Sequence, residues 1–149
     1  MKIVIDSSVW IAGIGSRKGF SSEAIFKSYK NNEIEIFISN QILEEIYSNL
    51  EKKLKFDSLS ALRAQKTVRN LCDYEAEITE REIKLVKIVK DNNDRHILAL
   101  CKKAQADYLI SFDKKHLLPL KKFAQTKILE PKDFIEDLKK WLITTTKSN

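Results

Sequence analysis

The first residues of the chain place the strongest constraint on its fold. Residues 3–5 read Ile-Val-Ile, an unbroken and mostly β-branched apolar run that predicts a short strand buried on both faces. Strands of that kind belong to parallel sheets that are covered by helices on both sides. The run ends at Asp6, and ligands of open parallel sheets bind beyond the carboxyl ends of the strands. Asp6 is therefore expected in a binding crevice, although capping of the next helix is an alternative role.

The rest of the chain alternates between strand and helix patterns. Further strands are expected at residues 33–39, 83–89, 108–111 and 126–129, and helices at 9–14, 21–31, 40–55, 58–74, 94–105 and 131–141. This alternation predicts an α/β fold, a three-layer α/β/α sandwich with a mainly parallel central sheet. A chain of 149 residues is long enough for one core. We expect a single domain at residues 1–143 and a frayed tail at 144–149.

The composition excludes several classes of protein. With 43% hydrophobic and 32% charged residues, the chain is typical of a soluble globular protein. It contains no apolar run near the ~20 residues of a membrane span and no signal-peptide pattern. Cys72 and Cys101 lack metal-ligand spacing and are expected as reduced, buried thiols. A cytoplasmic location follows from these features.

The charge of the chain suggests a partner. Lys and Arg total 27 against 21 Asp and Glu, a formal net charge of +6. Many of the lysines stand in pairs, at residues 52–53, 102–103, 114–115, 121–122 and 139–140. A solvated surface explains such lysines without any partner, but a basic surface also favours a polyanion, most commonly a nucleic acid.

Three further acidic positions are expected near Asp6. Asp113 follows the strand at 108–111, and Asp94 opens a helix on the stripe that faces the sheet, where N-capping is its alternative role. Glu44 and Glu45 lie one turn into the helix after the second strand, and helical geometry does not choose between them. Converging carboxylates repel one another unless a cation neutralises them.

This donor set indicates a particular chemistry. Oxygen ligands without Cys or His suit Mg²⁺ or Mn²⁺, and such ions on carboxylates cleave phosphodiesters. A phosphoaspartyl hydrolase would need an Asp where Ser8 stands. Neither His96 nor His116 lies near a nucleophile motif, so both are interpreted as surface or rim residues. A metal phosphatase or a DNA nuclease remains a generic alternative.

Five short segments carry a resemblance to a known family. They are Ile3–Trp10, Ile38–Ile46, Asp91–Leu98, Ala106–Leu117 and Ile128–Phe134. In this order and spacing, nearly the whole chain resembles the PIN-domain ribonucleases, specifically the toxin components (VapC-like) of prokaryotic toxin–antitoxin pairs. The resemblance implies an Mg²⁺- or Mn²⁺-dependent endoribonuclease with an RNA substrate and a small antitoxin partner. A homodimer is also expected.

The resemblance also implies site residues. By position, the catalytic and metal-binding acids are Asp6, Glu45, Asp94 and Asp113; Glu45 is chosen because the family's glutamate directly precedes the apolar residue that stands here as Ile46. Ser111 matches a small polar residue that often lines the site, and Asp91 an outer acid.

Two departures from the family pattern concern the activity. A Thr-Asn pair is replaced by Ser7-Ser8, and a second Asp shortly after Asp113 is missing from the run 114–116. They motivate the alternative of a weakly active or inactive PIN-like module that binds RNA or protein.

Overall fold

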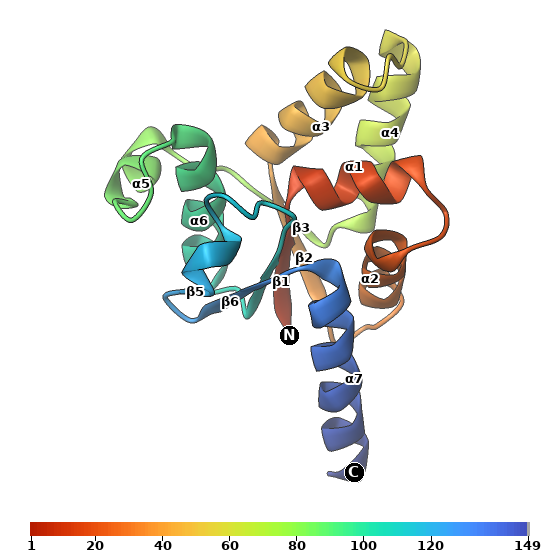
Figure 1. Cartoon of the computed structure of the whole chain (residues 1–149), viewed down its shortest axis with the longest axis vertical. Coiled ribbons are helices and arrows are strands. Elements are labelled where there is room, and N and C mark those ends of the chain that lie inside the picture. Colours follow the sequence, from red (N-terminus) through yellow and green to blue (C-terminus); the bar gives the residue numbers. More distant parts are fainter. Residues whose placement is uncertain (149) are drawn as a thin grey trace.

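A computed structural model describes residues 1–148, which form a six-stranded sheet in the order β3-β2-β1-β4-β6-β5 (Figure 1). All neighbouring strands are parallel except β5 and β6. The strands are β1 (Lys2–Ile5), β2 (Glu35–Ser39), β3 (Tyr74–Ala76), β4 (Tyr108–Ile110), β5 (Lys122–Phe123) and β6 (Thr126–Leu129). The expected α/β fold with a mainly parallel sheet is confirmed.

Helices cover both faces of this sheet. They are α1 (Ser7–Gly15), α2 (Phe20–Tyr29), α3 (Asn40–Lys52), α4 (Ser58–Leu71), α5 (Glu80–Leu85), α6 (Asn92–Ala104) and α7 (Pro131–Lys147), with a short 3-10 helix η1 (Leu118–Leu120). In Figure 1, α5 and α6 lie on one side of the sheet and α1, α2 and α7 on the other, while α3 and α4 form a pair at the top. Within residues 1–148, no helix is long and apolar enough to cross a membrane.

Strand β1 lies in the middle of the sheet, as its sequence predicts. It pairs with β2 on one side and with β4 on the other, so that Val4 stands between Phe37 and Leu109. The side chains of residues 3–5 are completely buried. The backbone N–H of Asp6 donates to the carbonyl of Ile110 at 2.9 Å, which continues the pairing up to the acid itself. The central strand thus delivers Asp6 to the carboxyl edge.

Leu98 tests how much the packing of α6 on this sheet contributes to stability. Its side chain is fully buried, so Leu98→Ala should lower the free energy of unfolding by about 2–5 kcal/mol through lost burial and a residual cavity. Leu59→Ala is the matched control, because Leu59 is 57% exposed and should change stability by less than about 0.5 kcal/mol. Urea denaturation of both variants checks this, and equal effects would contradict the assigned packing.

The prediction of a strand at 83–89 is wrong. Helix α5 occupies the start of this segment because Thr79 and Glu82 form a reciprocal capping box, which starts a helix. Of the β-branched residues that suggested a strand, only Val86 and Val89 are buried, and both lie in a segment without regular secondary structure. The third strand instead lies at β3, and the antiparallel strand β5 was also missed. Both are short edge strands, Tyr74–Ala76 and Lys122–Phe123, and neither carries the buried apolar run that marks β1 and β4.

The C-terminal helix is longer than expected. It begins at Pro131, as predicted, but it continues past residue 141 to Lys147. Residues 144–147 of the expected frayed tail are therefore helical, and residue 149 lies outside the described part of the chain. The assignment of residues 1–143 to one domain stays a prediction. Hydroxyls of residues 144–146 donate to carbonyls one turn earlier, so these polar side chains are satisfied within the helix.

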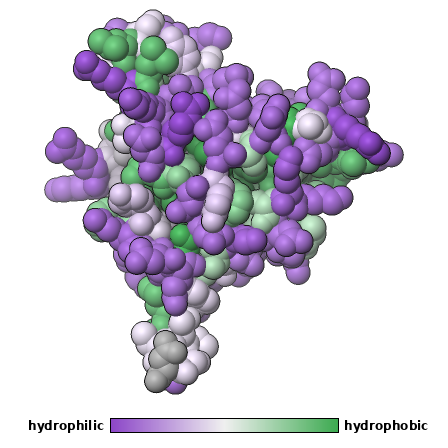
Figure 2. All heavy atoms as spheres, turned by 180° about the vertical axis from the view of Figure 1, so that it is seen from behind, coloured by the Kyte–Doolittle hydropathy of each residue, from purple (hydrophilic) through white to green (hydrophobic). Residues whose placement is uncertain are grey.

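Three exposed leucines gather at one end of the molecule. Leu54, Leu59 and Leu62 are each 44–57% exposed where α3 and α4 meet. Figure 2 shows hydrophobic colour at this end, while much of the rest of the visible face is hydrophilic. Neither cysteine forms a disulfide within residues 1–148; Cys101 is buried and Cys72 partly buried, as expected of reduced thiols.

Candidate active site

Polar side chains from four elements meet at the carboxyl edge of the sheet. Asp6 follows β1, Asp113 follows β4, Glu45 lies on α3 after β2, and Asp94 lies in the first turn of α6. Because parallel strands end at the same edge, their following residues come together although they are far apart in sequence. All four side chains remain partly accessible to solvent.

Three donors hold the carboxylate of Asp6. Its Oδ1 accepts from the backbone N–H of Ser7 at 2.8 Å, and its Oδ2 accepts from the hydroxyls of Ser8 and Ser111 at 3.0 and 2.8 Å. Asp6 therefore caps α1 and also points into the site, so the two roles weighed for it are compatible. Its Oδ1 keeps a free lone pair for a further ligand.

Glu45 is fixed by two side chains, and Glu44 points elsewhere. Glu45 Oε2 accepts from the hydroxyl of Ser7 at 2.9 Å, and Oε1 lies 2.7 Å from Nε2 of His96. Glu44 is exposed, and its Oε1 accepts from the amide of Asn40. The contact with Ser7 therefore connects Glu45, and not Glu44, to Asp6.

Asp94 is not the cap of its helix. The cap of α6 is Asp91, whose Oδ1 accepts from the backbone N–H of Asn93. Asp94 lies three residues later with a side chain that is 13% exposed, at the positive end of the helix dipole. Its carboxylate is therefore available for a partner from outside the helix.

Asp113 both shapes a turn and faces Asp94. Its Oδ1 accepts from the backbone N–H groups of Lys115 and His116 at 3.0 and 2.8 Å, which locks the turn after β4. Its Oδ2 is directed at the imidazole of His116, with Nδ1 at 3.7 Å, and the same Nδ1 lies 3.2 Å from Oδ2 of Asp94. One ligand atom from each of these three residues lies within 4.8 Å of the others.

The electrostatics of the cluster favour a cation. Burial raises the pKa of Asp6 above its usual value, and the neighbouring charge of Glu45 adds to the effect, while the hydrogen bonds from Ser111, Ser8 and Ser7 oppose it. Burial, followed by the charge of Asp113, also raises the pKa of Asp94. Negative charge is thus unfavourable at both carboxylates, and a divalent ion would relieve this. Among the described residues, the ligand atoms that lie within 4.8 Å of one another belong to Asp94, Asp113 and His116, a spacing that fits one divalent ion; Asp6 and Glu45 lie outside this group.

The sequence interpretation missed both histidines. His96 is wrongly placed at the surface, because the structure buries it against Glu45, and its Nδ1 has no partner among the described residues. Since Nε2 faces a carboxylate, we assign the proton to Nε2. The apolar run at residues 97–101 indicates that α6 is buried on most of its sides, and this was the sequence signal that His96 is buried. His116 does lie at the rim, but it contacts two of the predicted acids.

Comparison with solved structures supports this fold. VapC20 of Mycobacterium tuberculosis, a toxin that cleaves the sarcin-ricin loop, is 17% identical with a TM-score of 0.60, over 84% of this chain and 98% of that one. VapBC-1 of nontypeable Haemophilus influenzae is 14% identical with a TM-score of 0.61, over 89% and 99%. VapBC2 of Rickettsia felis, solved with a DNA fragment from the promoter, is 16% identical with a TM-score of 0.61, over 87% and 98%.

Comparison by sequence identifies the family. No curated protein sequence matches the chain significantly. A model of the PIN domain, in contrast, matches residues 2–115, which include β1, β4 and all four acids. The chain therefore belongs to the PIN domain family.

Proposed function

We propose that this protein is a metal-dependent endoribonuclease that hydrolyses RNA phosphodiester bonds. The observation that carries the proposal is the meeting of Asp94 and Asp113 beside the Asp6–Glu45 pair at the carboxyl edge of the sheet. Membership of the PIN domain family supports it. The raised pKa values of Asp6 and Asp94 support a cation in the same place.

Some residues of the site would bind an ion, and others would hold these ligands in position. Asp6, Glu45, Asp94 and Asp113 would bind Mg²⁺ or Mn²⁺. When bound, such an ion activates water and stabilises charge that develops on the phosphate. Ser8 and Ser111 orient Asp6, and His96 orients Glu45, so that the carboxylates keep their positions during the reaction.

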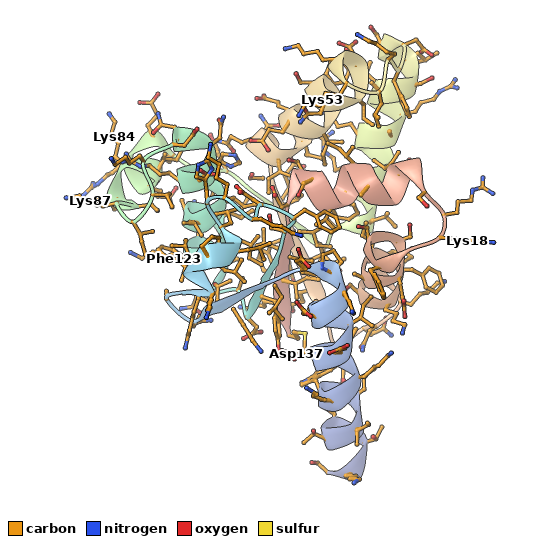
Figure 3. The ribbon with its side chains drawn as sticks, in the orientation of Figure 1. Lys18, Lys53, Lys84, Lys87, Phe123 and Asp137 are labelled. Atoms are coloured by element: carbon orange, nitrogen blue, oxygen red, sulfur yellow. The ribbon has the colours of Figure 1, made fainter. Side chains whose placement is uncertain are left out.

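Lysines around the site would hold the RNA backbone. Lys114 and Lys115 are exposed on the turn between Asp113 and His116, and Lys114 is only weakly paired, with Nζ 3.4 Å from Glu130. Other lysines, among them Lys18 and Lys84, extend outward from the molecule (Figure 3). Such a surface attracts a polyanion while the ion cancels the negative charge of the acids.

Removing the two lysines of this turn should weaken RNA binding in a salt-dependent way. For Lys114→Ala/Lys115→Ala in an Asp6→Asn background, the slope of log affinity against log salt concentration should fall by about 1 to 2, because each lysine releases counterions. Fluorescence anisotropy with labelled RNA measures this. Lys139→Ala/Lys140→Ala is the matched control, since it removes the same charge from exposed positions on α7. An equal loss in both variants would contradict a local contact.

A substrate panel tests the reaction itself. Purified protein is incubated with RNA, single-stranded DNA and small phosphate esters, each with Mn²⁺, with Mg²⁺ or with EDTA, beside Asp6→Asn protein prepared identically. We expect cleavage of RNA alone, only with metal and only by the wild type. Cleavage of the DNA or the esters would instead favour the other phosphate-ester chemistries. No metal-dependent cleavage would favour a binding module, although the contacts of Ser7 and Ser8 with the acids support an active site.

We also propose that the protein is the toxin of a toxin–antitoxin pair that acts in the cytoplasm. The similarity to VapC20, VapBC-1 and VapBC2 supports this role. An apolar groove between α1, α2 and α4 offers a docking surface for the small antitoxin protein; its lining includes Trp10, Ile14, Ile25, Phe26 and Leu71. The protein itself would be a homodimer.

Expression in a bacterial host tests the toxin role. Induced wild type should arrest growth and Asp6→Asn should not, and co-expression of a small protein encoded beside the gene should restore growth. Growth without arrest at a verified level of soluble wild type would contradict the proposal. Analytical ultracentrifugation of the Asp6→Asn protein determines whether it is a dimer.

A further inference from the structure

His116 belongs to the run 114–116, in which the second Asp of the family pattern is missing. Its imidazole reaches Asp94 with Nδ1 at 3.2 Å from Oδ2 and approaches Oδ2 of Asp113 to 3.7 Å. Ligands of an ion with ~2.1 Å bonds lie about 3 to 4 Å apart, and one ligand atom from each of these three residues lies within 4.8 Å of the others, so the three can approach one ion together. The side chain of His116 is 44% exposed, so an ion from solvent can reach the imidazole.

The turn that carries His116 is built to keep the imidazole there. Asp113 Oδ1 accepts from the backbone N–H of His116, and the carbonyl of Asp113 accepts from the N–H of Leu118 at 2.8 Å. Leu117 between them is 2% exposed and anchors the turn in the core. The turn leaves only Oδ2 of Asp113 free of backbone contacts, on the side of Nδ1 and of Asp94. These bonds therefore fix the backbone from which the imidazole extends towards the acids.

We infer that Nδ1 of His116 is a ligand of the catalytic ion, and that the site consequently prefers Mn²⁺ and similar first-row ions over Mg²⁺. This inference rests on the proposed binding of a divalent metal by the acids. Carboxylates suit Mg²⁺ and Mn²⁺ alike, whereas an imidazole favours ions later in the first transition row. One nitrogen among the oxygen ligands thus changes the selectivity of the site without adding negative charge.

Electron paramagnetic resonance of bound Mn²⁺ tests the nitrogen ligand directly. In tag-free wild-type protein, pulsed spectra should show coupling to a directly bound ¹⁴N. The chain has only two histidines, and His116→Ala and His116→Asp should both lose the coupling. Absence of coupling in the wild type, or its persistence in His116→Ala, would overturn the inference.

Calorimetric titration with Mn²⁺ and Mg²⁺ tests the selectivity. His116→Ala should weaken Mn²⁺ binding by at least about tenfold, and His116→Asp should lower the ratio of Mn²⁺ to Mg²⁺ affinity. If the imidazole only forms an ion pair with the acids, its removal leaves Mn²⁺ affinity unchanged or higher, which refutes the inference. If RNA is cleaved but no nitrogen coupling is seen, His116 is not a metal ligand, and the proposed ribonuclease activity still stands. If nitrogen coupling is seen but RNA is not cleaved, the proposed ribonuclease activity is wrong, and His116 is still a metal ligand.

Discussion

Asp6→Asn should abolish RNA cleavage, with a rate at least about 10³-fold below that of the wild type. The substitution keeps the shape of the side chain but removes the charge that helps to hold a divalent ion, and a bound metal contributes several kcal/mol to such reactions. The hydroxyls of Ser8 and Ser111 can rotate to accept from the new amide, so the local structure should persist. Single-turnover kinetics with labelled RNA measures the loss.

The same substitution should raise thermal stability in metal-free buffer. Burial raises the pKa of Asp6 in the folded protein, so the folded state binds this proton more tightly than the unfolded state. Ionisation of Asp6 therefore opposes folding. The contribution of Asp6 to the free energy of unfolding falls as the pH rises from its pKa in the unfolded chain to its higher pKa in the folded protein. Above that range Asp6→Asn should have the higher melting temperature, and below it the difference should shrink. A lower melting temperature at neutral pH in EDTA would contradict this account.

The two adjacent glutamates should differ strongly in their effect on catalysis. Glu45→Gln should reduce cleavage by about 10²- to 10³-fold, because Glu45 contacts Ser7 and His96 and would hold the ion. Glu44→Gln should stay within about twofold of the wild type, because Glu44 is exposed and contacts only Asn40 among the described residues. Rates of RNA cleavage at saturating Mn²⁺ compare the two variants.

These neighbouring substitutions control for each other. Each removes one negative charge from α3, so a general electrostatic effect on RNA binding would affect both alike. A large loss in Glu44→Gln with a small loss in Glu45→Gln would mean that the wrong glutamate is assigned to the site. Circular dichroism should show the same helical content for both, since neither side chain belongs to the core.

The sequence was sufficient to predict elements whose pattern is carried by adjacent residues. The buried run at residues 3–5 and the helix that starts near Asp91 are examples, because burial and capping are written in adjacent residues. Strands β3 and β5 could not be predicted in this way, because they are edge strands without a buried apolar run and are defined by their neighbours in the sheet. At residues 80–85 the capping box outweighed the β-branched residues that follow it.

For the site, sequence reasoning reached the acids and, through the family resemblance, Ser111, but not the contacts that hold the acids in place. The acids stand at strand ends and at a helix start, positions that a pattern can mark. The contact between His96 and Glu45 joins residues 51 positions apart, and the contact of Ser111 with Asp6 joins residues 105 positions apart. Such pairs depend on how α3, α6 and β4 pack, and one sequence does not encode this packing in any local pattern. The acids of this site stay a prediction until variants are measured.

The pairing of β1 with β4 also has a consequence during synthesis. The first strand leaves the ribosome early, but the residues that complete its edge, Ser111 and Asp113, come about a hundred residues later. Parallel pairs that span so much chain form slowly, because the intervening segment must be ordered first. A half-made chain thus lacks Asp94 and Asp113 and has no assembled acidic site. If the protein is a toxin, its activity begins only after most of the chain has been translated and folded, which leaves time for an inhibitor to bind.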